Sequence, residues 1–341
     1  EFHPVSEMIA QEALPGLVDK WLAQGKRVAG PSVVKPGYCL YVELESSAQL
    51  ALEGFVRPRN SIKEFVFPRH ETVCRYHFSG HTVETEDCDP PQSEQVIVGA
   101  RPCDAAALPI LDHLFTWDYE DKFYTERRKA TTVVTLACQT HDDECFCTSL
   151  DLGPAAEQGS DVLLLAMPGG YEVRCLTDKG KALFAGETRT AEQAAVVPPG
   201  PPVTVTPETV MTYLQASYDD PMWIDLALRC LGCGACAYTC PTCHCFDIVD
   251  EGTAAGGCRV KNWDCCQFAM FTQHASGHNP RPGQSQRQRQ RIQHKFRIYP
   301  EKFGVMLCTG CGNCARNCPV GLGVLSTLKE AAGHGPVEVG S

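Results

Sequence analysis

The sequence predicts an α+β fold of two domains joined by a linker. Residues 1–190 contain short runs rich in β-branched residues, which are typical of buried strands, together with a helical pattern. Residues 191–207 carry five prolines in their last ten positions and show no hydrophobic periodicity, as in a linker. Residues 208–335 carry helical patterns. We therefore expect a mixed α/β domain followed by an α-helical domain.

The expected elements of the first domain follow from these patterns. Gly169-Gly170 lies between two apolar stretches and predicts a β-hairpin. Ala105–Phe115 has the apolar spacing of a helix. The clearest strands are expected at Gln95–Ala100, Thr131–Leu136 and Asp161–Leu165.

The helical part begins at a recognisable start signal. Thr206, Pro207 and Glu208 supply an N-cap, a first-turn proline and a first-turn acid. Further helical segments are expected at Met211–Ser217, Met222–Arg229, Trp263–His274, Ser285–Phe296 and Val324–Ala332.

Composition excludes several classes of protein. The chain has 341 residues, of which 43% are hydrophobic, so it can bury a core of its own. Its net charge of −11 argues against nucleic acid as a partner. No apolar run approaches the roughly 18 residues of a membrane span, and the N-terminal residues lack a secretory signal pattern. The 21 cysteines, an odd number in a long chain, favour metal-bound thiolates in a reducing cytoplasm over disulfides.

One cysteine motif occurs twice. Its first copy is Cys230-x2-Cys233-x2-Cys236-x3-Cys240-Pro, and the same spacing returns 78 residues later from Cys308 onward. This is the run of two-cluster ferredoxins, in which the fourth cysteine ligates the other cluster. Zinc sites use pairs of cysteines instead of this triplet, so zinc is disfavoured.

The motif predicts two ligand sets in an α-helical ferredoxin-type domain. The long insert of 67 residues between the two copies distinguishes this domain from a compact ferredoxin. One [4Fe–4S] cluster is expected on Cys230, Cys233, Cys236 and Cys318. The second is expected on Cys308, Cys311, Cys314 and Cys240.

Four more cysteines could hold a third [4Fe–4S] cluster. Cys103 and Cys138 each follow the end of a predicted strand. If those strands are neighbours, both thiols reach the sheet edge where ligands commonly bind. The alternative is that they are ordinary buried cysteines. The complete set is Cys103, Cys138, Cys145 and Cys147.

The remaining cysteines carry weaker signals. Cys243, Cys245 and Cys266 are candidates either for further ligation or for packing around the clusters. Scattered positions are expected to be structural: Cys39, Cys74, Cys88, Cys175, Cys258 and Cys265. The basic run Arg287–Arg297 is interpreted as a solvated helix face or, alternatively, a docking surface for an acidic partner.

Several motifs are absent from the sequence. It contains no G-x-G-x-x-G after a strand and no phosphate-binding loop, so we expect no flavin or nucleotide in this chain. No residues stand out as a catalytic acid and base. A chain that holds several clusters but no site for transforming a substrate is expected to transfer single electrons. The two-electron hydride chemistry would then belong to a flavin in a partner chain.

Seven ordered motifs resemble the beta subunit of cytoplasmic sulfhydrogenases, which are NAD(P)-linked nickel–iron hydrogenases. An iron–sulfur subunit of anaerobic sulfite reductase is similar to the same broader family. The matching segments are RPCDAAALPILD, DKFYTERRK, CFCTSLDLGP, CLGCGACAYTCPTCHCFD, NWDCCQF, SGHNPRP and CTGCGNCARNCP.

The resemblance implies an iron–sulfur subunit that links a flavin-bearing, NAD(P)-binding subunit to the rest of a complex. The family's A-C-D and C-x6-C-x-C pieces match the four N-terminal cysteines, with Pro102 replacing an alanine, which implies a third cluster. The family's W-D-S-C motif matches Trp263 to Cys266, with Cys265 at the serine position.

Several alternatives stay open at this level. The terminal partner could be a hydrogenase, a sulfite reductase or a bifurcating assembly of the heterodisulfide-reductase type. The chain could instead be an enzyme that reduces a small sulfur species, either at a cluster with an open coordination site or at the second thiol group around Cys243 and Cys266. A solvent-accessible pocket with a three-cysteine cluster would favour this alternative. A third possibility is a scaffold whose first domain holds no cluster, which well-separated N-terminal cysteines would favour.

Overall fold

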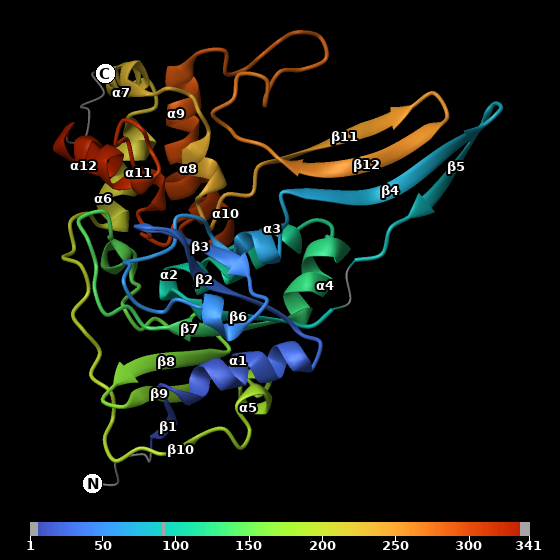
Figure 1. Ribbon diagram of the computed structural model, residues 1–341. Coiled ribbons are helices and arrows are strands. Elements are labelled where there is room, and N and C mark those ends of the chain that lie inside the picture. The colour runs from blue at the N-terminus through green and yellow to red at the C-terminus, as the bar shows by residue number, and fades with distance from the viewer. Residues whose placement is uncertain (1–5, 91–92, 335–341) are drawn as a thin grey trace.

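The computed structural model describes residues 6–90 and 93–334. Residues 1–5, 91–92 and 335 of the predicted domains lie outside this part. The described residues form an eight-stranded sheet, a four-stranded sheet that extends away from the body, and a group of helices at one end (Figure 1).

Parallel strands form the centre of the large sheet. The strands β2, β6, β7 and β8 are parallel neighbours, and β9 closes a hairpin with β8 at Gly169. The predicted strands and the hairpin are therefore confirmed. The strand order is β10-β1-β9-β8-β7-β6-β2-β3. Their bounds are β1 Glu7–Ala10, β2 Arg27–Lys35, β3 Tyr38–Glu43, β6 Gln95–Ala100, β7 Thr131–Leu136, β8 Val162–Met167, β9 Gly170–Cys175 and β10 Arg189–Thr190.

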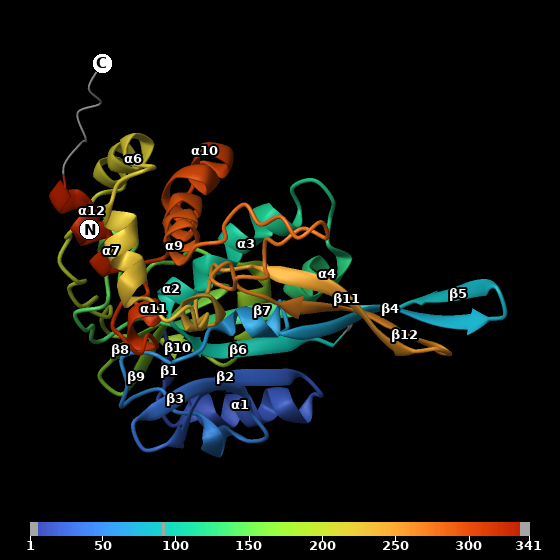
Figure 2. The same cartoon turned by 90° about the horizontal axis from the view of Figure 1, so that it is seen from above.

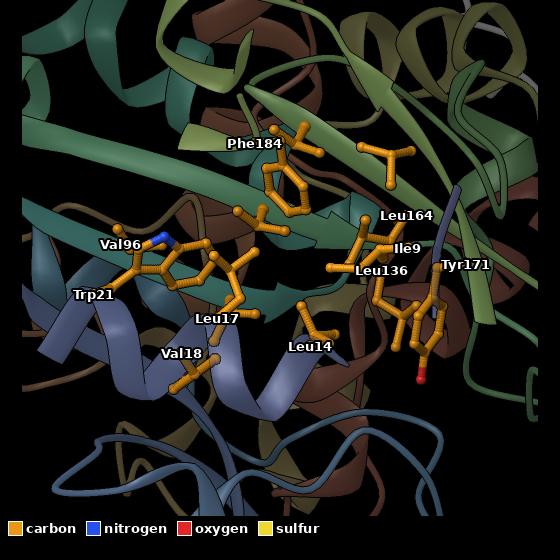
Figure 3. Packing of buried hydrophobic residues seen from close by; sticks show 14 of the residues in the cluster. Ile9, Leu14, Leu17, Val18, Trp21, Val96, Leu136, Leu164, Tyr171 and Phe184 are labelled. Carbon is orange, nitrogen blue, oxygen red and sulfur yellow. The ribbon is translucent and has the colours of Figure 1, made fainter. Parts of the chain in front are cut away.

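Helix α1 (Ala13–Ala23) and the short α5 (Asp178–Leu183) cover one face of the large sheet. Leu14 and Trp21 of α1 pack with Val96 of β6 and Leu164 of β8 in a buried cluster (Figure 3). Successive strand residues face opposite sides of a sheet, so Val96 and Val98 belong to this cluster while Ile97 belongs to the core of the other face.

The opposite face is covered by α2 (Pro102–Ala105), α3 (Ala107–Phe115) and α4 (Lys122–Ala130). The helix expected at Ala105–Phe115 is thus present. Trp263, from the C-terminal part of the chain, packs in the same core, and its indole nitrogen donates to the Phe67 carbonyl at 3.1 Å. The two parts of the chain therefore share a core.

The four-stranded sheet is also shared between the two parts. It joins two hairpins in the order β11-β12-β4-β5, and both reach out from the body (Figure 2). The C-terminal strand β12 pairs with β4, so Lys261 lies opposite Glu71 and bonds to it at 3.0 Å. The bounds are β4 His70–Ser79, β5 Thr82–Asp87, β11 Phe246–Thr253 and β12 Gly256–Trp263.

The β11–β12 hairpin lies in the insert between the cysteine motifs, which was expected to belong to an α-helical domain. The helix predicted at Trp263–His274 is wrong, because Trp263 ends β12 and the residues after it form turns. Pairing with β4 keeps β12 extended up to its end. In the turns that follow, the Asn279 side chain accepts a hydrogen bond from the Thr272 hydroxyl and donates one to the Ala269 carbonyl. Tertiary pairing has overridden the local helical spacing.

The other predicted helices of the C-terminal part are present. Thr206 caps α6, with its hydroxyl accepting from the Thr209 amide at 3.4 Å. The α9 helix continues through a π-helical turn at His294–Ile298 into α10. The bounds are α6 Pro207–Ala216, α7 Met222–Arg229, α8 Ala235–Tyr238, α9 Gln284–Gln293, α10 Tyr299–Phe303, α11 Asn313–Arg316 and α12 Val324–His334.

The proline-rich segment 191–207 lies against the body. Thr148 donates to the Pro201 carbonyl at 2.6 Å, and the Thr204 amide donates to the Ser149 hydroxyl at 3.1 Å. The segment was expected only to link the two domains, and it also covers the loop that carries Cys147.

Leu164→Ala tests the core of the large sheet. Leu164 is fully buried, so we expect the substitution to lower the free energy of unfolding by about 2–5 kcal/mol through lost transfer energy and a cavity. Anaerobic thermal unfolding would measure the loss. Leu228→Ala is the control, because Leu228 is 82% exposed and its removal should change stability by less than about 0.5 kcal/mol. Equal effects of the two substitutions would contradict this account of the core.

Candidate iron-sulfur centres

In the part of the chain that the structure describes, three cavities are each lined by four or more cysteines. Each contains one complete set of the cysteines that the sequence groups together. The first cavity is lined by Cys230, Cys233, Cys236 and Cys318. The second cavity is lined by Cys240, Cys308, Cys311 and Cys314. The third cavity is lined by Cys103, Cys138, Cys145 and Cys147, with Cys311 at its inner side.

The third cavity lies where two parallel strands end. Strands β6 and β7 are neighbours, as the sequence argument required. Cys103 follows β6 in the first turn of α2, and Cys138 follows β7 with its amide bonded to the Pro154 carbonyl at 2.8 Å. The carboxyl ends of parallel strands thus bring the thiols together, and the loop with Cys145 and Cys147 completes the lining.

The two motif copies fold alike around the first and second cavities. In each, a loop carries the first two cysteines and leads through a glycine of positive φ into a short helix, α8 or α11, which carries the third. The fourth cysteine follows that helix and lines the other copy's cavity: Cys240 lies in the second and Cys318 in the first. Backbone amides also approach the sulfurs, with Val324 donating to Cys314 and Leu322 to Cys318, each at 3.3 Å.

The cavities lie in a row, in the order third, second, first. Cys311 lines both the third and the second cavity, and Arg291 lines both the second and the first. At Gly310, whose φ is +64°, a side-chain carbon would lie 2.5 Å from the backbone of Cys147. The Phe146 amide also donates to the Gly310 carbonyl at 2.9 Å. Only glycine permits this close approach between the loops of the third and second cavities.

Arg57 lies between the third and second cavities. Its Nη1 donates to the Cys311 carbonyl at 3.0 Å and lies 3.5 Å from the Cys103 sulfur, while Nη2 bonds to Asp104 at 2.7 Å. Burial opposes its charge, but Asp104 and the thiols of Cys311 and Cys103 raise the pKa of Arg57 well above its ordinary value. The guanidinium is therefore a fixed positive charge beside the cysteines.

Arg291 and Lys295 supply positive charge to the second cavity. Burial opposes the charge of Arg291, yet the thiols of Cys236 and Cys314 raise its pKa well above its ordinary value. Lys295 Nζ donates to the Leu307 carbonyl at 2.9 Å and lies 3.4 Å from the Cys240 sulfur. Among the described residues, neither cation forms an ion pair with a carboxylate.

The unpaired donors of Arg291 fit an anionic cluster. Its Nε and Nη2 are buried without a hydrogen-bond partner, as is the hydroxyl of Thr309 in the second cavity. A buried charge with unpaired donors is costly unless an acceptor of opposite charge lies beside it. Thiolates and sulfides of an iron–sulfur cluster are such acceptors, so the residues present fit this cofactor.

These cations correct the interpretation of the basic run Arg287–Arg297. Arg287, Arg291 and Lys295 recur every four residues and are all buried, so they form neither a solvated face nor a docking surface. Arg289 instead stacks on the Tyr218 ring at 3.7 Å on the outer side of α9. The spacing of four was visible in the sequence, and it could have indicated one inward basic face.

The three low-priority candidates, Cys243, Cys245 and Cys266, do not line the three cavities. The Cys243 thiol contacts Cys240. The thiols of Cys245 and Cys265 both contact Cys266, and with donation from Gln267 they lower the pKa of Cys266 well below its usual range. In the described part of the chain, no three His, Cys, Asp or Glu side chains are arranged around a single metal ion.

Comparison with known proteins defines the class of this chain. Residues 229–322 match the family described as the 4Fe-4S dicluster domain, so the C-terminal part is an iron–sulfur domain. The chain is 30% identical over 248 residues to sulfhydrogenase 2 subunit beta of Pyrococcus furiosus, which covers 69% of this chain and 73% of that protein. It belongs to the iron–sulfur family of sulfhydrogenase beta subunits, as its motifs indicated. No solved structure matches it. Within the residues described, no helix has the length and apolar character needed to cross a membrane.

Arg291→Met tests the buried cation. A buried unit charge a few ångströms from a cluster contributes a few kcal/mol at an effective dielectric of about 20, on the order of 100 mV for one electron. We therefore expect the reduction potential of one or both C-terminal centres to fall by about that amount. EPR-monitored redox titration would measure it, on samples with matched iron content.

Arg289→Met is the matched control on the same helix, because Arg289 faces Tyr218 and Asp219 instead of the cavities. Arg291→Lys should lower the reduction potential less than Arg291→Met does, because lysine keeps the positive charge but lacks the planar guanidinium group. Potentials that are equal in all three variants would contradict a charge role for Arg291.

Proposed function

We propose that this chain is an electron-transfer subunit that holds three [4Fe–4S] clusters, one in each cysteine cavity. The observation that supports it most strongly is the row of three cavities, each lined by the four cysteines that one cubane requires. When bound, each cluster supplies a site that accepts and releases one electron. The protein's part is to hold the thiolates, exclude water and fix the surrounding charge.

We propose that electrons pass between the catalytic or bifurcating subunits of an anaerobic oxidoreductase, such as a hydrogenase, and a flavin-bearing, NAD(P)-binding subunit. The relative's name, a beta subunit of sulfhydrogenase, supports a place in a heteromeric complex. Cys233 is exposed, so the first cavity opens toward a surface that a partner can reach. The third cavity lies at the other end of the row. A cytoplasmic location and the division into domains 1–190 and 208–335 belong to the same proposal.

The alternatives from the sequence have less support. An enzyme with an open cluster site would need a cavity with three cysteines, whereas each of these cavities has at least four. A first domain that only docks partners would leave its four cysteines apart, whereas they line one cavity. Whether the complex is a hydrogenase or a sulfite or sulfur reductase depends on its terminal subunits. The proposed electron relay in this chain would suit either kind of complex.

Iron and acid-labile sulfide analysis tests the number of clusters. Anaerobically purified protein should hold about twelve irons per chain, because each cubane contains four. Cys138→Ser should lower the count by about four, and EPR of the reduced sample should lose one signal. Cys175→Ser is the control, because Cys175 lies on β9 away from the three cavities.

About eight irons in the unmodified protein, unchanged by Cys138→Ser, would confine the clusters to the C-terminal domain. The first domain would then be a docking module, and the three-cluster proposal would fail.

A further inference from the structure

A group of thiols lies beside the first and second cavities and has no role in the ligand sets described above. It consists of Cys245, Cys265 and Cys266, and we call it the thiol cluster. Cys265 is fully buried, while Cys245 and Cys266 are partly exposed. All three lie where β11 begins and β12 has just ended, so the hairpin fixes their relative positions.

The hairpin brings Cys245 and Cys266 together. The Asp264 amide donates to the Cys245 carbonyl at 2.9 Å, which extends the β11–β12 ladder by one step beyond Phe246 and Trp263. The Cys245 sulfur contacts both the thiol and the backbone amide of Cys266. The ladder places Asp264 opposite Cys245, and the turn that follows Asp264 brings the sulfur of Cys266 against that of Cys245.

Hydrogen bonds connect the thiol cluster to the first cavity. Gln267 Nε2 lies 3.6 Å from the Cys266 sulfur, and Gln267 Oε1 accepts from Gln284 Nε2 at 3.0 Å. The same Gln284 nitrogen lies 3.3 Å from the sulfur of Cys230. A continuous chain of side chains therefore runs from Cys266 to a cysteine of the first cavity.

The second cavity also lies near the thiol cluster. Cys243, two residues before Cys245, contacts the thiol of Cys240. Two positions proposed for one-electron carriers are therefore near a pair of thiols, and conversion of a dithiol to a disulfide involves two electrons in total.

We propose that Cys245 and Cys266 form a redox-active dithiol–disulfide couple that exchanges two electrons with the iron–sulfur relay of this chain. This inference depends on the proposed electron-transfer function and assigns an additional two-electron site within it.

The step balances in electrons and protons. In the oxidised form one S–S bond joins the sulfurs of Cys245 and Cys266. Two electrons, delivered singly by iron–sulfur clusters as the reductant, break that bond, and two protons from solvent complete the two thiols. In the opposite direction the thiol protons leave, the S–S bond forms, and the two electrons return to oxidised clusters one at a time.

Cys265 is a neighbour of the couple without being a member of it. A bond between the adjacent Cys265 and Cys266 would close a strained ring through one peptide, whereas Cys245 contacts Cys266 from a separate segment of the chain. The Cys265 thiol donates to the Gly234 carbonyl at 3.8 Å and contacts Cys266, so it packs beside the couple.

Counting electrons in an anaerobic reductive titration is the first test. The intact protein is oxidised with an organic redox dye and then titrated with dithionite, with cluster reduction followed by EPR. Unmodified protein should take up two electrons more than the Cys266→Ser and Cys245→Ser variants. Cys265→Ser is the matched control and should take up as many electrons as the unmodified protein.

Peptide mapping of unmodified protein is the second test and needs no variant. Samples from both ends of the titration are quenched in acid, alkylated and digested. The oxidised sample should contain a Cys245–Cys266 disulfide, and the reduced sample should carry alkyl groups on both cysteines. Alkylated Cys245 and Cys266 in both samples would overturn the proposal.

Iron content separates the failure of this proposal from the failure of the relay. Loss of about four irons in Cys266→Ser would make Cys266 a cluster ligand and overturn the couple. An unchanged iron count with equal electron uptake in all variants would also overturn it, while leaving the relay intact. Unmodified protein without iron or labile sulfide would instead refute the proposed function itself.

Discussion

Buried negative charge is the constraint on which the rest of this structure depends. Thiolate-bound clusters are anions, and most cysteines of the second cavity are buried away from the water that would screen such a charge: Cys240, Cys311 and Cys314. The chain meets this constraint with buried cations from distant segments. Arg57 comes from the first part of the chain, and Arg291 and Lys295 come from the helix between the two motifs. The buried, unpaired donors of Arg291 would be destabilising in any protein that left the first two cavities without an anion.

The same constraint explains why the two parts of the chain are so closely joined. Arg57 reaches the Cys311 carbonyl, and Asn313 Nδ2 donates to carbonyls of residues 58–60 at 3.1–3.2 Å. Lys261 of β12 is bonded to Glu71 of β4 and Asp121 near α4. These contacts join the segments that line the third and second cavities, and the proposed electron path between the two would need such a defined separation.

Sequence reasoning reached the cavities because their geometry is encoded locally or by simple topology. The repeated cysteine motif predicts that its fourth cysteine lies in the cavity of the other copy, as Cys240 and Cys318 do. The meeting of Cys103 and Cys138 follows from two parallel strands. The β11–β12 hairpin escaped notice because its residues are mostly exposed and carry no apolar alternation, so only pairing with β4 defines it. The inward face of α9 was missed because basic residues are usually solvated, and a buried cation becomes favourable only beside an anion that the sequence does not display.

The crossing of the two motifs also bears on the order in which the molecule can be built. A ribosome releases the N-terminal part of the chain first, and the cysteines of the third cavity emerge early. The first cavity still lacks Cys318 at that stage, and the second lacks three of its four cysteines. The third cavity lacks Gly310 and Cys311, which form its inner wall. The cysteine sets of the first and second cavities are therefore completed only when the second motif has left the ribosome, whereas the four cysteines of the third cavity are present much earlier and lack only this wall.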